Sequence, residues 1–122
     1  MVRRVFAEFL GAATLVAVVI GSGIMAVNLT DDVGIQLLIN ALATAAGLGV
    51  LIWVLGPISG AHFNPAVTLV AATRREIPLP EASGHVVVQV AGAIAGATLA
   101  NLMFSLPAWS ESTTERSNGG LW

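Results

Sequence analysis

The fold of this chain is decided by the stretch Ser59–Thr68, which has the sequence SGAHFNPAVT and interrupts an otherwise very apolar chain. Its Asn64-Pro65 step is a place where a helix can begin. Irregular backbone at membrane depth must be buried in protein or face a water-filled cavity, because lipid cannot satisfy its hydrogen-bonding groups. The stretch therefore indicates a path through a membrane protein rather than a simple membrane anchor.

The composition is that of an integral membrane protein. Of the 122 residues, 56% are hydrophobic and 10% are charged, and the mean hydropathy is +0.85. Soluble domains carry about 25% charged residues. The net charge is only -2, and no basic stripe with interleaved aromatic residues suggests binding of nucleic acid. The chain has no cysteine, so neither disulfides nor thiolate chemistry is expected. We predict an all-α membrane protein.

Long apolar segments predict three membrane-spanning helices, each near the ~20 residues that cross a bilayer. The predicted spans are residues 5–27, 33–55 and 83–106. A shorter apolar helix over 65–73 reaches only part of the way across, which suits a re-entrant half-helix. These segments form one predicted domain over 1–106. The polar segment 107–122 is predicted to be an extracytoplasmic tail without regular structure.

Arginines predict how the chain lies in the cell membrane. Arg3 and Arg4 precede the first span, and Arg74 and Arg75 lie between the half-helix and the third span. The positive-inside rule places all four, and hence the N-terminus, in the cytoplasm, and three crossings place the tail outside. A signal peptide is the alternative for the first span, but Glu8 and the length of the apolar run argue against it.

The Asn-Pro step suggests how a solute would be contacted. Asn64 is predicted to cap the half-helix and Pro65 to occupy its first position, where no amide donor is needed. The Asn64 amide can then donate to a passing solute, next to a helix N-terminus that carries roughly half a positive charge. The preceding backbone carbonyls form a predicted ladder of acceptors. These acceptors belong to Gly60, Ala61, His62 and Phe63. A neutral hydroxylated molecule can use such groups, whereas a cation is opposed by the helix dipole.

The wider run Gly56–Leu69 resembles the first Asn-Pro-Ala loop of the aquaporin and glycerol-facilitator family. Ala7–Gly11 resembles the opening of that family's first helix, and Gln89–Gly96 resembles its third helix. The resemblance covers nearly the whole chain up to the polar tail. It implies three transmembrane helices plus one re-entrant half-helix, and passive flow of water or small neutral solutes such as glycerol-like polyols and metalloid acids.

The resemblance covers only half of the family's architecture. Members contain two inverted repeats, and the second repeat supplies another Asn-Pro-Ala loop and an arginine beside the filter. Here one Asn-Pro-Ala triplet occurs, and Arg116 is the only arginine after Arg75. We therefore expect half of a channel that needs a second repeat, supplied by a complementary chain. A flipped second copy is opposed by the arginine distribution, whereas a homo-oligomer through the first helices is plausible because full members are tetramers.

The alternative function is a non-conducting membrane protein, either truncated or regulatory, that associates with a full-length channel. An enzyme is not expected, because no catalytic triad, carboxylate pair, cysteine–histidine cluster or phosphate-binding loop can be assembled from these residues. We likewise expect no cofactor and no metal site. The expected partners are the lipid bilayer, water or small neutral solutes, and a second-repeat chain or further copies of this chain.

Polar residues within the spans have predicted structural roles. The resemblance implies that Glu8 braces the loop before Asn64 through hydrogen bonds, with a proton relay as the less favoured interpretation. Gln89 is predicted to form an interhelical hydrogen bond, and Gly92, Gly96 and Ala100 to allow close helix packing. His85 is expected at the membrane interface.

Two further residues carry open alternatives. The resemblance implies that the His62 ring is held by loop packing, with a role in pH gating as the alternative. Thr44, counted back from Asn64, matches the family's filter position, where many members place a bulky aromatic ring. A threonine there would leave a wider and more polar constriction that favours polyols or metalloid acids. The alternative is that Thr44 only bonds a backbone carbonyl.

Overall fold

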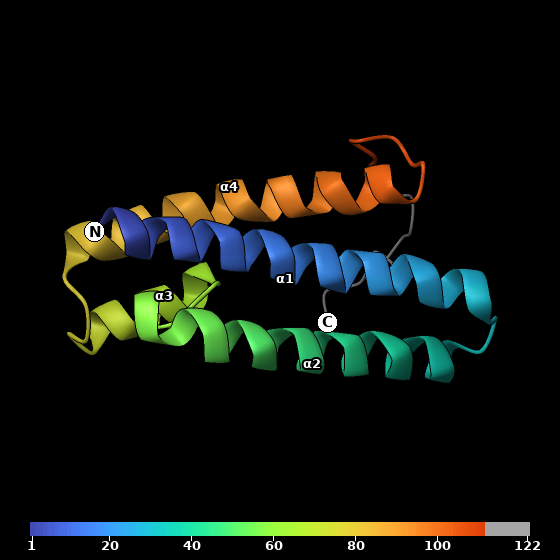
Figure 1. Cartoon of the computed structure of the whole chain (residues 1–122), viewed down its shortest axis with the longest axis horizontal. Coiled ribbons are helices and arrows are strands. Elements are labelled where there is room, and N and C mark those ends of the chain that lie inside the picture. Colours follow the sequence, from blue (N-terminus) through green and yellow to red (C-terminus); the bar gives the residue numbers. More distant parts are fainter. Residues whose placement is uncertain (112–122) are drawn as a thin grey trace, which may run out of the picture.

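A computed structural model describes residues 1–111, in which four helices and their connections are defined (Figure 1). The helices are α1 (Val2–Leu29), α2 (Val33–Ser59), α3 (Pro65–Thr73) and α4 (Leu79–Met103). Three of them are long and apolar enough to cross a membrane. The predicted fold class, three long apolar helices with one short helix, is confirmed. Residues 112–122 of the predicted tail lie outside the described part of the chain.

Several helix boundaries differ from the predicted ones. Helix α1 is longer at both ends, and α4 ends at Met103 rather than at residue 106. Two further differences have a clear cause. The span predicted to stop at residue 55 continues through Pro57 to Ser59, and it ends because Gly60 adopts a left-handed conformation with φ of 91°. Glycine has no Cβ and takes this conformation without strain. The last helix begins at Leu79, earlier than residue 83, because prolines at its first turn need no amide donor.

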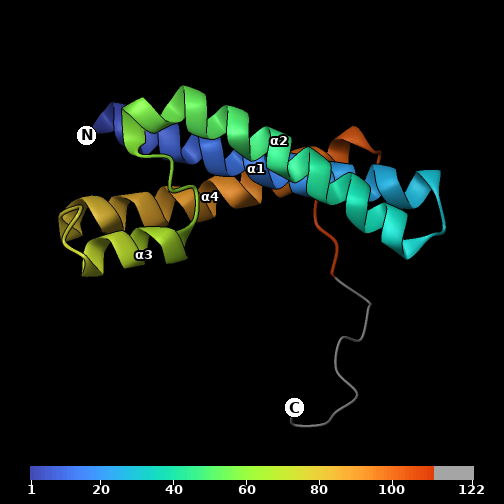
Figure 2. The ribbon, with the colours of Figure 1, turned by 90° about the horizontal axis from the view of Figure 1, so that it is seen from below.

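Helix α1 is the centre of the arrangement. It packs along both α2 and α4, whereas the short α3 lies against α4 (Figures 1 and 2). Gly92 and Gly96 permit the close approach of α4 to α1. A Cβ atom built on Gly92 would lie 2.5 Å from the Phe9 carbonyl oxygen, and one built on Gly96 would collide with the Ala13 backbone. Close packing through small residues is how helices associate in lipid.

Helix α2 has a different environment. Among the described helices it packs only against α1, and its outer surface is apolar and open, with Trp53 83% exposed. Such a surface suits lipid or another membrane-embedded protein. Its inner face meets α1 through the Asn40 amide, which donates to the Val19 carbonyl at 2.8 Å and to Ser22 at 3.0 Å.

Candidate functional site

Asn64 lies exposed at the tip of α3 and caps it. Its Oδ1 atom accepts a hydrogen bond from the Ala66 amide at 2.8 Å, and Pro65 occupies the first turn. Both placements follow the predicted start of the helix. Because the cap uses the side-chain oxygen, the two amide hydrogens of Asn64 stay available to another molecule.

The loop Gly60–Phe63 before Asn64 has an unusual backbone. Ala61 and Phe63 adopt φ angles of 54° and 53°, and Gly60 adopts 91°. Left-handed conformations cost side-chain-bearing residues on the order of 1–2 kcal/mol each, and they persist only where the surrounding structure imposes them. Something outside the loop must therefore hold its shape.

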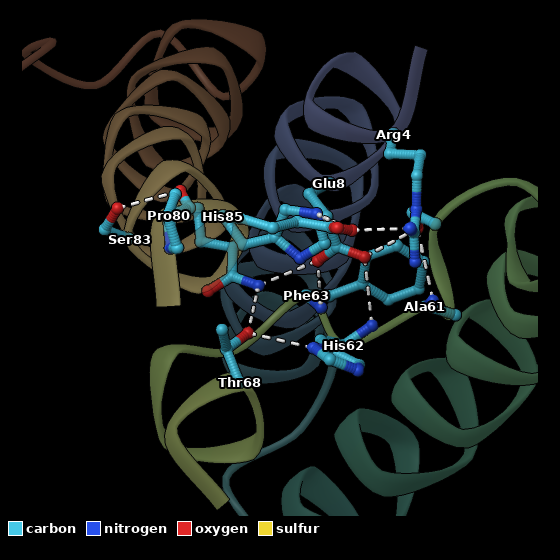
Figure 3. Close-up of polar contacts among 12 residues, drawn as sticks. Arg4, Glu8, Ala61, His62, Phe63, Thr68, Pro80, Ser83 and His85 are labelled. Carbon is cyan, nitrogen blue, oxygen red and sulfur yellow. Dashed lines mark hydrogen bonds and ion pairs between the residues drawn. The ribbon is translucent and has the colours of Figure 1, made fainter. Parts of the chain in front are cut away.

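Glu8 of α1 supplies that constraint. The carboxylate is fully buried and accepts four hydrogen bonds (Figure 3). Its Oε1 atom accepts from the Ser59 hydroxyl at 2.6 Å and the His62 amide at 3.1 Å, and its Oε2 atom accepts from the Phe63 amide and the Gln89 side chain, both at 2.7 Å. Hydrogen bonds to a charged acceptor are stronger than neutral ones. The structure thus brings Glu8 and Gln89 together around the loop.

The same set of contacts reaches α3 through Thr68. The Gln89 amide donates to Thr68 Oγ1 at 2.8 Å, and this oxygen lies 3.1 Å from His62 Nδ1. Since Thr68 accepts from Gln89, its own hydrogen can be donated to the His62 ring. We call these contacts the Glu8 network. Its members are the side chains of Glu8, Ser59, Thr68 and Gln89, the His62 ring and the amides of His62 and Phe63.

Sequence reasoning missed two members of this network. No role was predicted for Ser59 or Thr68, although both side chains are almost fully buried. The available signal was a hydroxyl side chain at each end of the Ser59–Thr68 stretch in an apolar environment. Such a group needs a partner when it is buried.

Phe63 is fixed by packing as well as by its amide. Its ring is buried with Ala7 and Leu55, and it lies against Gly11 so closely that any Cβ at Gly11 would collide with it. In residues 1–111, no donor is recorded for the carbonyl oxygens of Gly60–Phe63. The amides on one side of this loop are therefore satisfied, while its carbonyl oxygens are left for other partners.

Thr44 lies apart from the Glu8 network, near the middle of α2. The residue is partly exposed, but its hydroxyl oxygen is buried and has no hydrogen-bond partner among the described residues. The alternative in which it bonds a backbone carbonyl is therefore not observed. His85 lies near the start of α4, and its side chain is fully buried within the protein, whereas its predicted place at the membrane interface stays a prediction.

Comparison with known proteins gives the family. Residues 1–119 match the major intrinsic protein family. The whole chain is 50% identical to aquaglyceroporin AqpS of Rhizobium meliloti and covers 52% of it. Human aquaporin-2 is 44% identical over 97 residues, which are 80% of this chain and 34% of the relative. Aquaporin NIP1-2 of Arabidopsis thaliana is 36% identical over 104 residues, 85% of this chain and 35% of the relative.

The chain spans about half, or less, of the length of these three relatives. The matched part carries the Asn-Pro-Ala loop and the helices on either side of it. The matched residues and the four-helix architecture agree with each other. The chain belongs to the major intrinsic protein family of aquaporins and glycerol facilitators, and it corresponds to the N-terminal half of that family.

Proposed function

We propose that this chain supplies one half of a passive membrane channel for water and small neutral solutes, and that a second repeat completes the pore. One observation carries the proposal. The Glu8 network draws the amides of His62 and Phe63 to one side of the loop, and the carbonyls of Gly60–Phe63 have no donors within residues 1–111. These acceptors lead to the exposed amide of Asn64. Acceptors followed by a donor can replace the hydration of a small hydroxylated molecule as it passes.

Helix α3 supports selection against cations. The N-terminus of this nine-residue helix lies beside Asn64. The backbone amides of its first turn point outward, and this end of the helix carries roughly half a positive charge. The charge is fixed there because Asn64 caps the helix. A cation approaching the tip is repelled, whereas a neutral solute is not.

The name of one relative supports solutes larger than water. An aquaglyceroporin shares half of its aligned residues with this chain. We assign Thr44 to the constriction, where its small polar side chain admits polyols that an aromatic ring would exclude. The buried hydroxyl of Thr44, which has no partner in the part of the chain that the structure describes, supports a donor that finds its partner in the complete pore.

The proposed partner is a second repeat carried by another segment or chain. Helix α2 and the outer side of α3 have open apolar surfaces that another membrane-embedded unit can cover. The arginines also support a cytoplasmic N-terminus. Arg3 and Arg4 begin α1, Arg74 and Arg75 follow α3, and these two ends lie on the same side of the structure (Figure 1). Assembly of several copies through their first helices is proposed as a second mode of association.

The decisive experiment is swelling of proteoliposomes. The chain is reconstituted alone, and then together with the C-terminal half of the Rhizobium relative. We expect slow swelling alone and rapid swelling with both halves. Rapid swelling by the chain alone would refute the need for a second repeat. A stable two-part complex that does not conduct would refute the channel and favour a non-conducting, regulatory protein.

A second measurement tests the assignment of Thr44. In the two-part pore, Thr44→Trp should reduce glycerol flux much more than water flux, because the indole ring narrows the constriction. Ala45→Trp, one position away on the exposed side of α2, is the matched control and should leave both fluxes near the unsubstituted level. If Thr44→Trp changes neither flux, Thr44 does not line the constriction.

A further inference from the structure

His85 is a buried histidine that the proposed channel does not use. It lies in α4, it is fully buried, and neither ring nitrogen has a hydrogen-bond partner among residues 1–111. A neutral imidazole has one donor and one acceptor, and buried polar groups are normally paired. Within residues 1–111, both nitrogens of this buried ring therefore have unused hydrogen-bonding capacity.

Two acceptors lie on either side of this ring, one helical turn away in each direction. A Glu81 carboxylate oxygen is 3.7 Å from His85 Nε2. Gln89 Oε1 is buried and has no hydrogen-bond partner among the described residues. Side chains four residues apart on a helix are neighbours. A protonated imidazole has two N–H donors, so the charged ring can engage both acceptors, whereas the neutral ring engages neither in this structure.

Charged and titratable groups from α1, from α4 and from the loop surround His85. The groups that act on His85 are Arg4 and Glu8 from α1, Glu81 from α4 itself and His62 from the loop. Figure 3 labels Arg4, Glu8, His62 and His85. Arg4 already pairs with Glu81 at 2.7 Å. The His62 ring meets His85 edge to face, with 5.7 Å between ring centroids and 75° between planes. Burial of the ring is the main effect that opposes a proton on His85, and Arg4 and His62 oppose it as well, whereas the two carboxylates stabilise it.

We propose that His85 is a proton-binding switch that controls the loop Gly60–Phe63. A proton taken from solvent places N–H groups on both ring nitrogens. Nε2–H then donates to Glu81, and Nδ1–H donates to Gln89 Oε1. The Gln89 amide nitrogen is the group that donates to Glu8 and Thr68, so turning Gln89 toward His85 weakens those bonds.

The consequence for the loop follows from its backbone. Ala61 and Phe63 hold left-handed conformations that the Glu8 network imposes. When Gln89 withdraws from Glu8 and Thr68, the loop relaxes and its carbonyls leave their positions along the proposed path. Acid should therefore reduce conduction. This part of the inference rests on the proposed function, whereas the protonation and the loop response do not.

Nuclear magnetic resonance of the full chain in lipid nanodiscs tests the switch without any conduction. Histidine rings and backbone amides are followed from about pH 5 to 8, where imidazole groups usually titrate. We expect the His85 ring to gain its second proton in this range, and the amide signals of His62 and Phe63 to shift with the same midpoint. His85→Phe and His85→Gln should both abolish the loop response; two variants are used so that poor folding of one does not decide the result.

His62→Gln assigns the titrating ring signal, because it removes the other histidine of the pair. The signal assigned to the His85 ring should still titrate in this variant. The proposal is overturned if His85 does not titrate between about pH 5 and 8, or if the loop response survives in both His85 variants.

Flux through the two-part pore tests the link to conduction, with equal pH on both sides of the liposome. We expect water flux to be several-fold lower at about pH 5.5 than at about pH 8, and to be independent of pH in His85→Phe. A loop that titrates while the flux stays constant would overturn the link to conduction. Absence of flux at every pH would contradict the proposed channel, and the magnetic resonance result would still decide the switch.

Discussion

The contact between α1 and α4 contains two neighbouring regions that depend on opposite features, polar side chains in one and the absence of side chains in the other. In the first, Glu8 and Gln89 meet through charged and polar groups that must all be present. In the second, Gly92 and Gly96 lie against the backbone of Phe9–Ala13, and side-chain atoms must be absent. The glycine region fixes how closely the helices approach, and the Glu8 network uses that approach to hold a loop.

The difference reflects what stabilises a protein in lipid. Helices gain little there from hydrophobic burial against each other, so close packing and hydrogen bonds decide their association. A buried acid in a membrane span is costly and needs partners. Glu8 has four donors, three of which come from the end of α2 and the following loop. Removing a group from the Glu8 network should therefore lower the stability of the protein. Adding a side chain in the glycine region should lower it as well.

Glu8→Ala should cause the largest loss of stability, by about 3–5 kcal/mol, as expected when one partner of a buried ionic network is removed. The donors that lose their acceptor are on Ser59, His62, Phe63 and Gln89. Thermal unfolding in detergent measures the effect. The unfolding temperature of Glu8→Gln should fall between those of Glu8→Ala and the unsubstituted chain, because glutamine keeps the side-chain volume and one acceptor oxygen.

Glu76→Ala is the matched control for Glu8→Ala. Glu76 pairs with Arg74 at 2.9 Å, but both side chains are largely exposed. Exposed ion pairs contribute between about 0 and 1 kcal/mol. If the two alanine variants unfold at the same temperature, Glu8 does not brace the loop.

Gly96→Leu should cause the next largest loss, by about 1–3 kcal/mol, because the new side chain is forced into the Ala13 backbone and the helices must separate. Thermal unfolding again measures it. Ala95→Leu adds the same side chain on the exposed side of α4 and should change little. Equal unfolding temperatures for these two variants would show that close approach at Gly96 is not required.

Much of the glycine region and of the helix framework could be predicted from the sequence. The apolar spans, the Asn64-Pro65 start of α3 and the small residues at 92, 96 and 100 are local patterns with a direct physical meaning. The burial of His85 could not be predicted in the same way. In a membrane protein both the lipid-facing and the protein-facing sides of a helix are apolar, so periodicity does not show which side faces α1.

The conformation of the loop Gly60–Phe63 was even harder to predict from the local sequence. Alanine and phenylalanine disfavour positive φ, so nothing in the residues 60–63 indicates left-handed backbone at Ala61 and Phe63. The cause is a carboxylate that precedes the His62 amide by 54 residues in the chain. Only the fold brings the two together, which explains why the partners of Glu8 had to be found in the structure.

Ala61→Gly should have the smallest effect and the opposite sign. Glycine adopts the φ of 54° at this position without the strain that alanine carries, although it also gives the unfolded chain more freedom. The net result should be a stabilisation of under about 1 kcal/mol, measured by thermal unfolding. Ala66→Gly is the control, because Ala66 lies in the ordinary helical backbone of α3, where the same change should destabilise by about 0.5–1 kcal/mol. If both variants are destabilised alike, the backbone at Ala61 is not strained, and the Glu8 network is not needed to impose its left-handed conformation.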